Sequence, residues 1–380
     1  MIALHDYQDP AVAELVSSNR GICHAPAGSG KTIIGAAAIA QWTLPRFLSR
    51  GQKIKAAWIC NTMEQVAQGQ SAVAAFPAIE AAADITFACY QSSLSLAGFE
   101  LVILDECHHI AAPEFRKMLN YHEGIRWGLT ATPNRDDDLK KDVFELIGPI
   151  VHVVERAALV DSGKLAKAIV MMLQPNRPKE MESAIAQAAG PEIERRMTRF
   201  GKFSGISEQE MKARVIWQYA QDIGIFENKA RNDATVAMAN AHANDSVLLL
   251  IGKIEHGEFL SERIPGSAVV HSKMGAKKRR AAIAAFGAGD LPCMIATSLA
   301  DEGLDVPRAN VLILAAGGRS AAKAEQRTGR VLRRFDGKTH GKIFDFMDVQ
   351  HYFLLAQSKR RMGVYRQLGY NVSLPEEVRP

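Results

Sequence analysis

The sequence lacks the features of membrane, secreted and metal-framework proteins. Its longest apolar stretches, such as residues 33–40 and 311–316, fall well short of the roughly 18 residues that a membrane-spanning helix needs. The first twenty residues contain no basic segment followed by an apolar one, so no secretory signal is expected. The five cysteines are scattered, with no C-x-x-C pair, which argues against a zinc site or a disulfide framework. We therefore expect a soluble, cytoplasmic chain with reduced thiols and no membrane partner.

Aromatic residues and long runs of like charge are also scarce. Aromatics make up only 7% of the chain and do not interleave with the basic stretches, so stacking on nucleic-acid bases is not expected. No block of like charge is longer than Lys277–Arg280, and 47% of the residues are hydrophobic, which excludes a disordered chain. Residues 241–380 hold 21 Lys+Arg against 14 Asp+Glu, although the whole chain carries only +5. This asymmetry fits either a polyanion partner or an ordinary solvated surface.

Short apolar runs alternate with helical patterns along the 380 residues, which is the βαβ rhythm of parallel sheets. The pattern predicts two α/β domains, residues 1–152 and 153–380. Residues 175–244 have almost no strand signal and predict a helical insertion in the second domain, and residues 350–368 predict a basic helix. The predicted strands are 21–25, 54–60, 84–90, 101–105 and 125–130, followed by 167–173, 247–251, 268–271, 293–297, 311–314 and 342–346.

A glycine-rich loop, Ala25-Pro-Ala-Gly-Ser-Gly-Lys-Thr32, follows the first predicted strand and precedes a helical run over 33–42. Its glycines would let backbone N–H groups converge on phosphate oxygens at a helix N-terminus. Lys31 would neutralise the β- and γ-phosphates, and the Thr32 hydroxyl would ligate Mg²⁺. A glycine turn with a chance Lys-Thr is the alternative, because the general pattern has Gly where Ala25 stands. The expected phosphate-binding residues are Gly28, Ser29, Gly30, Lys31 and Thr32.

An apolar strand ends in two acids, Asp105 and Glu106. Carboxylates at the carboxyl edge of a sheet suit a metal-bound phosphate, so we expect Asp105 to hold Mg²⁺ and Glu106 to polarise the attacking water. A solvated acidic turn is the alternative, and the presence of the Lys31 loop argues against it. Cys107, His108 and His109 follow, but adjacent residues seldom chelate a metal together, so we assign them no metal site.

These segments, with four others, resemble the superfamily 2 helicases, in the DEAD/DEAH-like group that includes XPB, RadD and UvsW. The resemblance is an ordered set of motifs over nearly the whole chain. It implies two RecA-like parallel-sheet domains of the P-loop NTPase fold, with ATP and Mg²⁺ in the cleft between them. The motifs are Leu4–Gln8 (Q motif), Ala25–Thr32 (motif I), Asp105–His108 (motif II), Thr130–Pro133 (motif III), Ala296–Pro307 (motif V) and Gln326–Arg333 (motif VI).

The resemblance also implies roles for residues outside the phosphate loop. Arg330 and Arg333 lie three apart on a helix-like segment and would point at the γ-phosphate as arginine fingers. Gln8 would read the adenine edge. Gly303 would permit close backbone approach, and Asp305 would accept a bond from the ribose or from an arginine finger. The residues expected to relay the nucleotide state to the strand site are His108, Thr130, Thr132 and Gln326.

The family places nucleic acid across the tops of both domains, and we expect backbone electrostatics to dominate its binding. The expected contacts are Asn61, Thr62, Tyr90, His271, Ser272, Thr297 and Ser298. Cys89 departs from relatives that commonly have Thr there, which leaves one phosphate contact open. The resemblance favours DNA over RNA, so the predicted function is an ATP-dependent DNA helicase or translocase. An RNA helicase and a nucleotide-gated binding module without processive movement stay as alternatives.

Overall fold

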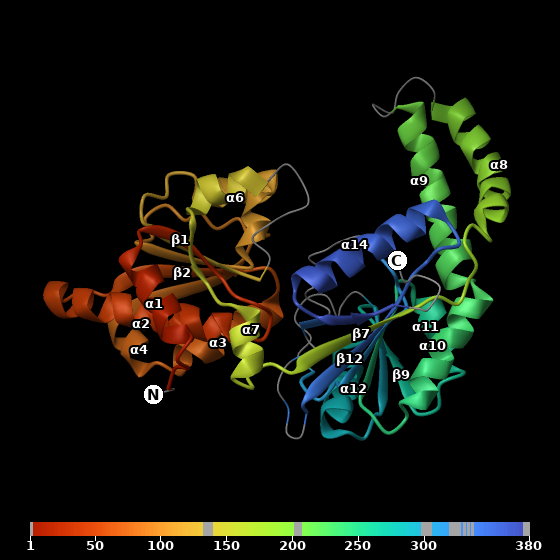
Figure 1. Ribbon diagram of the computed structural model, residues 1–380. Coiled ribbons are helices and arrows are strands. Elements are labelled where there is room, and N and C mark those ends of the chain that lie inside the picture. Colours follow the sequence, from red (N-terminus) through yellow and green to blue (C-terminus); the bar gives the residue numbers. More distant parts are fainter. Residues whose placement is uncertain are drawn as a thin grey trace. The chain divides into compact units, whose positions relative to one another are not determined.

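The chain folds into two compact units, Met1–Leu165 and Ala166–Pro380, each built on one parallel sheet with helices (Figure 1). The computed structural model describes residues 3–131, 140–200, 207–297, 306–318, 328–329, 332, 335 and 338–374. Within these ranges, no helix has the length and apolar character that crossing a bilayer requires. The predicted fold class, two parallel-sheet α/β domains, is confirmed.

The first unit has a six-stranded sheet in the order β3-β2-β4-β5-β1-β6. Its inner strands are almost fully buried, which explains why they read as continuous apolar runs in the sequence. The strand that the sequence did not reveal is β6, which lies at the edge and is partly exposed. The strands are β1 (Arg20–His24), β2 (Ile54–Cys60), β3 (Ala83–Cys89), β4 (Leu101–Asp105), β5 (Ile125–Thr130) and β6 (Ile150–Val153).

Helices cover both faces of this sheet. One face packs on a core around Trp58 and Trp127, both 0% exposed, and the other on a core that includes Cys107 and Val143. α2 is longer than the predicted helical run and continues through Pro45. The helices are α1 (Gln8–Ser17), α2 (Lys31–Arg50), α3 (Met63–Ala74), α4 (Pro77–Ala82), η1 (Cys107–Ala111), α5 (Pro113–Arg116), η2 (Lys117–Leu119), α6 (Lys140–Ile147) and α7 (Arg156–Asp161).

The division between the units falls after Leu165, later than the predicted boundary at residue 152. Two elements beyond residue 149 belong to the first unit. β6 pairs with β1, and the following helix α7 buries Leu159 in the first core. Because these contacts are with strands far back in the sequence, the local pattern around residue 152 does not reveal them.

The second unit has a seven-stranded parallel sheet in the order β13-β7-β12-β11-β8-β10-β9. Its short C-terminal strand β13, which was not predicted, pairs with β7 at the edge. The strands are β7 (Lys167–Leu173), β8 (Val247–Leu250), β9 (Ser267–Val270), β10 (Cys293–Ala296), β11 (Val311–Leu314), β12 (His340–Phe346) and β13 (Asn371–Ser373). The helices that flank these strands are α11 (Ile254–Ser261), α12 (Ala276–Ala288) and α14 (Tyr352–Gln367).

Helices fill the segment between β7 and β8, where the sequence predicted a helical insertion. α8 (Glu182–Phe200) and α9 (Glu208–Gln221) run side by side and extend away from the sheet (Figure 1). We call this pair the helical arm. α8 is one helix that continues through Pro191. A short π-helix, η3 (Asp222–Phe226), joins the arm to α10 (Lys229–Ala241), which packs on the sheet through Ala239.

The close packing of α2 on the first sheet gives a prediction for Gly35. A Cβ at this position would lie 2.8 Å from Leu129 Cδ1 and 2.9 Å from Trp58 Cη2. Gly35→Ala is therefore expected to lower the free energy of unfolding by about 1–3 kcal/mol through overpacking. Helix propensity alone would instead stabilise the variant by about 1 kcal/mol. Urea denaturation, monitored by circular dichroism, measures whether the free energy of unfolding falls or rises.

The matched control is Gly363→Ala in α14. No atom outside its own helix lies within 4 Å of a Cβ built there, within the part of the chain described. Propensity then acts alone, and the variant should gain up to about 1 kcal/mol. A Gly35→Ala protein as stable as the Gly363→Ala protein would contradict the packing argument.

Candidate functional site

The carboxyl ends of β1, β4 and β5 form the centre of the candidate site in the first unit. These strands are neighbours in the sheet and all run parallel, so the segments that follow them meet at one edge. The segments are the phosphate loop after β1, the acidic pair after β4 and Ala131 after β5. Residues far apart in the sequence are thus brought together as the motifs predicted.

Two glycines give the phosphate loop its shape. Gly28 and Gly30 have φ values of 86° and 78°, a left-handed conformation that glycine adopts without strain. Gly30 is the N-cap of α2, so Lys31 and Thr32 open the helix. The first-turn N–H groups of α2 therefore point toward the loop, which is the arrangement that binds a phosphate group.

Two residues of the Q motif form hydrogen bonds to the phosphate loop. Tyr7 Oη donates to the Ser29 carbonyl oxygen over 2.9 Å, and Gln8 Nε2 donates to the same oxygen over 3.2 Å. Gln8 is only 4% exposed, and its Oε1 accepts from the His5 N–H over 3.0 Å. A Cβ on Gly30 would lie 2.7 Å from Gln8 Nε2, so any larger residue there would displace the Gln8 side chain in addition to straining φ. Tyr7 is not among the predicted site residues, although it lies next to Gln8 within the same motif.

The acidic pair lies against the loop lysine. Lys31 Nζ is 3.8 Å from Glu106 Oε1 and donates to the Ala25 carbonyl oxygen over 3.3 Å. Glu106 has φ 47°, a conformation that a residue other than glycine adopts only at an energetic cost. Asp105, at the end of β4, is 6% exposed. The turn that holds both acids is therefore strained and closely packed, as is common at functional sites.

The two carboxyl groups differ in their ionisation. Burial, and then the negative charge of Glu106, raise the pKa of Asp105 to about 7. Burial also acts to raise the pKa of Glu106, but Lys31, followed by His108 and His109, outweighs it and the pKa is lowered. Glu106 is thus held ionised. The ionised form of Asp105 is less stable, because the positive charge nearby does not offset its burial and the charge of Glu106.

These features fit Mg²⁺ and a nucleotide phosphate. A divalent cation would supply the charge that Asp105 lacks, and carboxylate and hydroxyl oxygens are the ligands that Mg²⁺ prefers. Thr32, at the start of α2, would provide the hydroxyl. Ser29 Oγ is buried in the loop and has no hydrogen-bond partner among the described residues, which leaves it for a phosphate oxygen.

A chain of contacts joins the acidic pair to motif III. His108 Nδ1 lies 3.2 Å from Thr130 Oγ1 and 3.6 Å from Glu106 Oε2. Thr130 Oγ1 in turn donates to Glu106 Oε2 over 3.5 Å. The ends of β4 and β5 are therefore linked through three side chains. His24, which the sequence analysis did not single out, contacts the Ala131 carbonyl oxygen through Nε2 over 2.9 Å.

Tyr90 is a correction to the sequence analysis, which expected it to contact nucleic acid. Its side chain is 1% exposed, packs on Phe115 and donates from Oη to the Asp105 carbonyl oxygen over 3.0 Å. Tyr90 thus supports the end of β4 from inside the core. Tyr90 directly follows β3, and its ring points into the core, where it cannot stack on nucleic-acid bases. Sequence alone does not show in which direction a residue after a strand points.

Asn61 and Thr62 lie at the carboxyl end of β2, next to β4. The Thr62 hydroxyl caps α3 by accepting from the Gln65 N–H over 3.3 Å, and Gln65 Oε1 accepts from both backbone N–H groups of Asn61 and Thr62. Asn61 Oδ1 also accepts from Gln91 Nε2 over 3.2 Å. The two residues are partly exposed and lie at the same edge as the phosphate loop.

In the second unit, three expected contacts follow neighbouring strands. His271 and Ser272 come directly after β9, and Thr297 comes after β10, which pairs with β9. Exposed cations on and before α12 lie beside them, and none forms an ion pair with another described residue. These cations are Lys273, Lys277, Lys278 and Arg280. The predicted residues Thr132, Ser298, Gly303, Asp305, Gln326, Arg330 and Arg333 lie outside the described residues.

Two family models match the chain. The model described as "Type III restriction enzyme, res subunit" matches residues 1–135, and the model described as "Helicase conserved C-terminal domain" matches residues 230–335. The first range holds the phosphate loop and the acidic pair, and the second holds β8 to β11 and motif VI.

Curated relatives align with most of the chain. The DNA 3'-5' helicase XPB of Kineococcus radiotolerans is 26% identical over 347 residues, which are 87% of this chain and 57% of the relative. The DNA 3'-5' translocase XPB2 of Sulfurisphaera tokodaii is 24% identical over 365 residues, 88% of this chain and 80% of the relative. The chain spans about half the length of several of the curated relatives that it matches.

Solved structures share the fold. The Type ISP restriction-modification enzyme LlaBIII bound to DNA matches with a TM-score of 0.65 at 13% identity, over 98% of this chain and 31% of that chain. The Hef helicase domain of Pyrococcus furiosus matches with a TM-score of 0.54 at 14% identity, over 90% and 95% of the two chains. Together, the motifs, the two family models and the aligned relatives support a superfamily 2 helicase that is similar to the XPB helicases.

Proposed function

We propose that the chain is an ATP-dependent DNA helicase or translocase that couples ATP hydrolysis to 3′–5′ movement along nucleic acid. The observation that carries the proposal is the linked set at one sheet edge. Lys31 lies within ion-pair distance of Glu106, which reaches motif III through His108 and Thr130. A site that only bound a nucleotide would not need the connection to motif III. The aligned relatives named DNA 3'-5' helicase or translocase support the choice of substrate and direction.

In this proposal, residues of the first unit bind and hydrolyse ATP. The backbone N–H groups of Gly28–Gly30 and the Lys31 ammonium bind the phosphates, and Gln8 uses its second N–H and lone pair for the adenine. Thr32 and Asp105 would hold Mg²⁺, and the bound cation would supply positive charge to the transferred phosphoryl group. Glu106 is kept ionised by Lys31 and accepts a proton from the attacking water.

The coupling residues transmit the state of the nucleotide. Lys31 pairs with Glu106 in this structure, and a bound γ-phosphate would compete for the same ammonium. Glu106 would then shift its contacts toward His108 and Thr130, which begins motif III. We propose Thr132 and Gln326 as further members of this relay. In the second unit, Arg330 and Arg333 are proposed as arginine fingers, and Gly303 and Asp305 as nucleotide contacts.

We propose that nucleic acid binds through its backbone at the carboxyl edges of both sheets. Asn61 and Thr62 would contact it in the first unit, and His271, Ser272, Thr297 and Ser298 in the second. The exposed cations around α12 provide the electrostatic attraction. No Phe, Tyr or Trp is part of this set, which favours binding with little sequence preference.

Two substitutions test the ATP site. Lys31→Ala should remove nucleotide turnover, because no other described side chain brings positive charge to the loop so closely. Glu106→Gln keeps the size of the side chain but cannot accept the proton, so ATP binding should persist while kcat falls by about 10²–10⁴-fold. Phosphate release measures turnover, and a fluorescent ATP analogue measures binding. Wild-type turnover in the Glu106→Gln protein would remove Glu106 from the mechanism.

The nucleic-acid substrate is tested by comparing ATPase stimulation by single-stranded DNA, branched DNA and RNA. Preferential stimulation by DNA is expected, together with displacement of a strand or a bound blocking protein. Stronger stimulation by RNA would favour an RNA helicase. Stimulation by DNA without any displacement would favour a nucleotide-gated remodelling module.

The salt dependence of binding tests the role of the α12 cations. The affinity for single-stranded DNA should fall with salt at a log–log slope of about −0.7 for each neutralised phosphate. Lys277→Gln should therefore make the slope shallower by about 0.7. Lys53→Gln, at the opposite edge of the first sheet before β2, is the matched control and should leave the slope unchanged. Equal slopes for all three proteins, measured by fluorescence anisotropy, would exclude Lys277 from the contact surface.

A further inference from the structure

A buried group of four charges lies in the second unit outside every motif discussed so far. Arg231 and Asp345 are 0% exposed, and Asp348 and Arg361 are 2% exposed. Arg361 lies on the helix that the sequence predicts to be basic, but its side chain is buried. Burying four charges costs free energy unless each is paired and hydrogen-bonded, so their geometry is tightly constrained. We call Arg231, Asp345, Asp348 and Arg361 the charge network.

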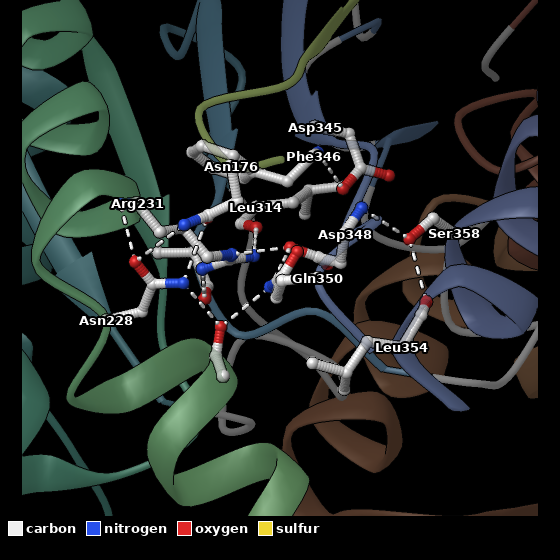
Figure 2. Close-up of polar contacts among 12 residues, drawn as sticks. Asn176, Asn228, Arg231, Leu314, Asp345, Phe346, Asp348, Gln350, Leu354 and Ser358 are labelled. Atoms are coloured by element: carbon white, nitrogen blue, oxygen red, sulfur yellow. Dashed lines mark hydrogen bonds and ion pairs between the residues drawn. The ribbon is translucent and has the colours of Figure 1, made fainter. Parts of the chain in front are cut away.

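Within the network each charge has a partner of opposite sign. Arg361 binds Asp345 through two bonds, Nε to Oδ2 over 2.8 Å and Nη2 to Oδ1 over 2.9 Å. Arg231 Nε donates to Asp348 Oδ1 over 2.9 Å, as Figure 2 shows. A contact of 3.7 Å between Arg361 Nη2 and Asp348 Oδ2 joins the two pairs. Tyr365 Oη donates a further bond to Asp345. The network is thus electrically balanced and continuous.

The remaining guanidinium N–H groups bind the chain where it leaves β11. Arg231 Nη1 donates to the Ala315 carbonyl oxygen over 2.5 Å, and Arg361 Nη1 donates to the Gly318 carbonyl oxygen over 2.7 Å. Between them, Gly317 has φ 63°, and a Cβ there would lie 2.8 Å from Ile225 Cδ1. Both arginines therefore fix the backbone of residues 315–318. Residues 319–325, which lie outside the described part of the chain, separate this segment from motif VI, at 326–333. Within motif VI, Thr328 Oγ1 lies 3.1 Å from Tyr370 Oη, and Tyr370 stacks on Tyr365, which binds Asp345.

The same network anchors the base of the helical arm. Gln350 Nε2 lies between Asp348 Oδ1, at 3.4 Å, and the carbonyl oxygen of Gly224 in η3, at 2.8 Å (Figure 2). Asn228 Nδ2 donates to the same Gly224 oxygen over 3.0 Å. A Cβ on Gly224 would lie 2.5 Å from Leu354 Cδ1, so α14 packs tightly on this turn. The arm's base and the exit of β11 are thus held by one set of side chains.

We propose that the charge network positions motif VI. Arg231 and Arg361 act as positioning residues that hold residues 315–318, and Tyr365 links Asp345 to Tyr370, which contacts Thr328 of motif VI. The proposal rests on the proposed function of Arg330 and Arg333. Four mutually dependent charges keep one arrangement or lose it together, which suits a support that must place a catalytic side chain. Arginine is required because its planar fork can bind a carboxylate with two bonds and a carbonyl oxygen with a third.

The test is Arg361→Lys, which keeps the charge but cannot make the three directed bonds. We expect kcat for ATP hydrolysis, measured with saturating nucleic acid, to fall at least about 10-fold, because a finger contributes on the order of 10³–10⁵ in rate. The KM for ATP should stay within about two-fold, since the phosphate loop belongs to the first unit. Arg360→Lys, the same substitution at the exposed neighbour on α14, is the matched control and should behave as wild type.

A second variant separates positioning from stability. Asp348→Asn keeps the shape of the side chain, and it should lower kcat without raising the KM. Because Arg361 and Asp348 belong to one network, the variant that carries both substitutions should be no more than about two-fold slower than the slower single variant. Ile343→Val removes one methylene from the 0%-exposed core of β12, and it provides a protein destabilised without a change in the network.

The outcomes are distinct. If folded Arg361→Lys or Asp348→Asn protein keeps wild-type kcat, or if Ile343→Val loses kcat to the same degree, the positioning role is overturned. The positioning role would also be overturned if the fall in kcat of the double variant equalled the product of the two single falls, because the two residues would then act independently. If the wild-type protein itself hydrolyses no ATP, the proposed function fails instead.

Discussion

The buried carboxylate pair at the end of β4 is the constraint on which the first unit depends. Asp105 and Glu106 are adjacent, and the positive charge that compensates them comes chiefly from Lys31, which the glycine turns of the phosphate loop bring back over the sheet. The compensation is incomplete, because the pKa of Asp105 is raised to about 7. A bound phosphate group would draw on the same lysine and a divalent cation would supply the missing charge, so the binding of the two would be electrostatically linked.

The second unit contains the opposite electrostatic arrangement. In the charge network every carboxylate faces an arginine, and burial acts to lower the pKa of Arg361 while Asp345 raises it above its usual range. A balanced group of this kind is rigid and has no spare charge for a ligand. An unbalanced site suits a ligand that arrives and leaves, whereas a balanced one suits a permanent support. The two units thus use buried carboxylates for different purposes.

The sequence revealed the inner strands to within about two residues at each end, because strands buried on both faces of a parallel sheet form continuous apolar runs. It missed β6 and β13, which lie at sheet edges, are short and are partly exposed. It placed the boundary between the units too early, because β6 is recognised only through its pairing with β1. It also predicted that Lys31, Asp105 and Glu106 lie in one site, since their order and spacing form a local motif, and the structure brings them to one edge of the sheet.

The sequence by itself therefore determined the fold class, the order of the motifs and the residues at the phosphate loop, all of which depend on local pattern. The tertiary structure alone decided which side chains are buried and how they are charged. It turned Tyr90 inward beneath Asp105 and placed Arg361 against Asp345 rather than in solvent. The physical reason is that burial and ionisation arise from partners distant in the sequence, such as Arg231 and Asp348, and no local pattern encodes them.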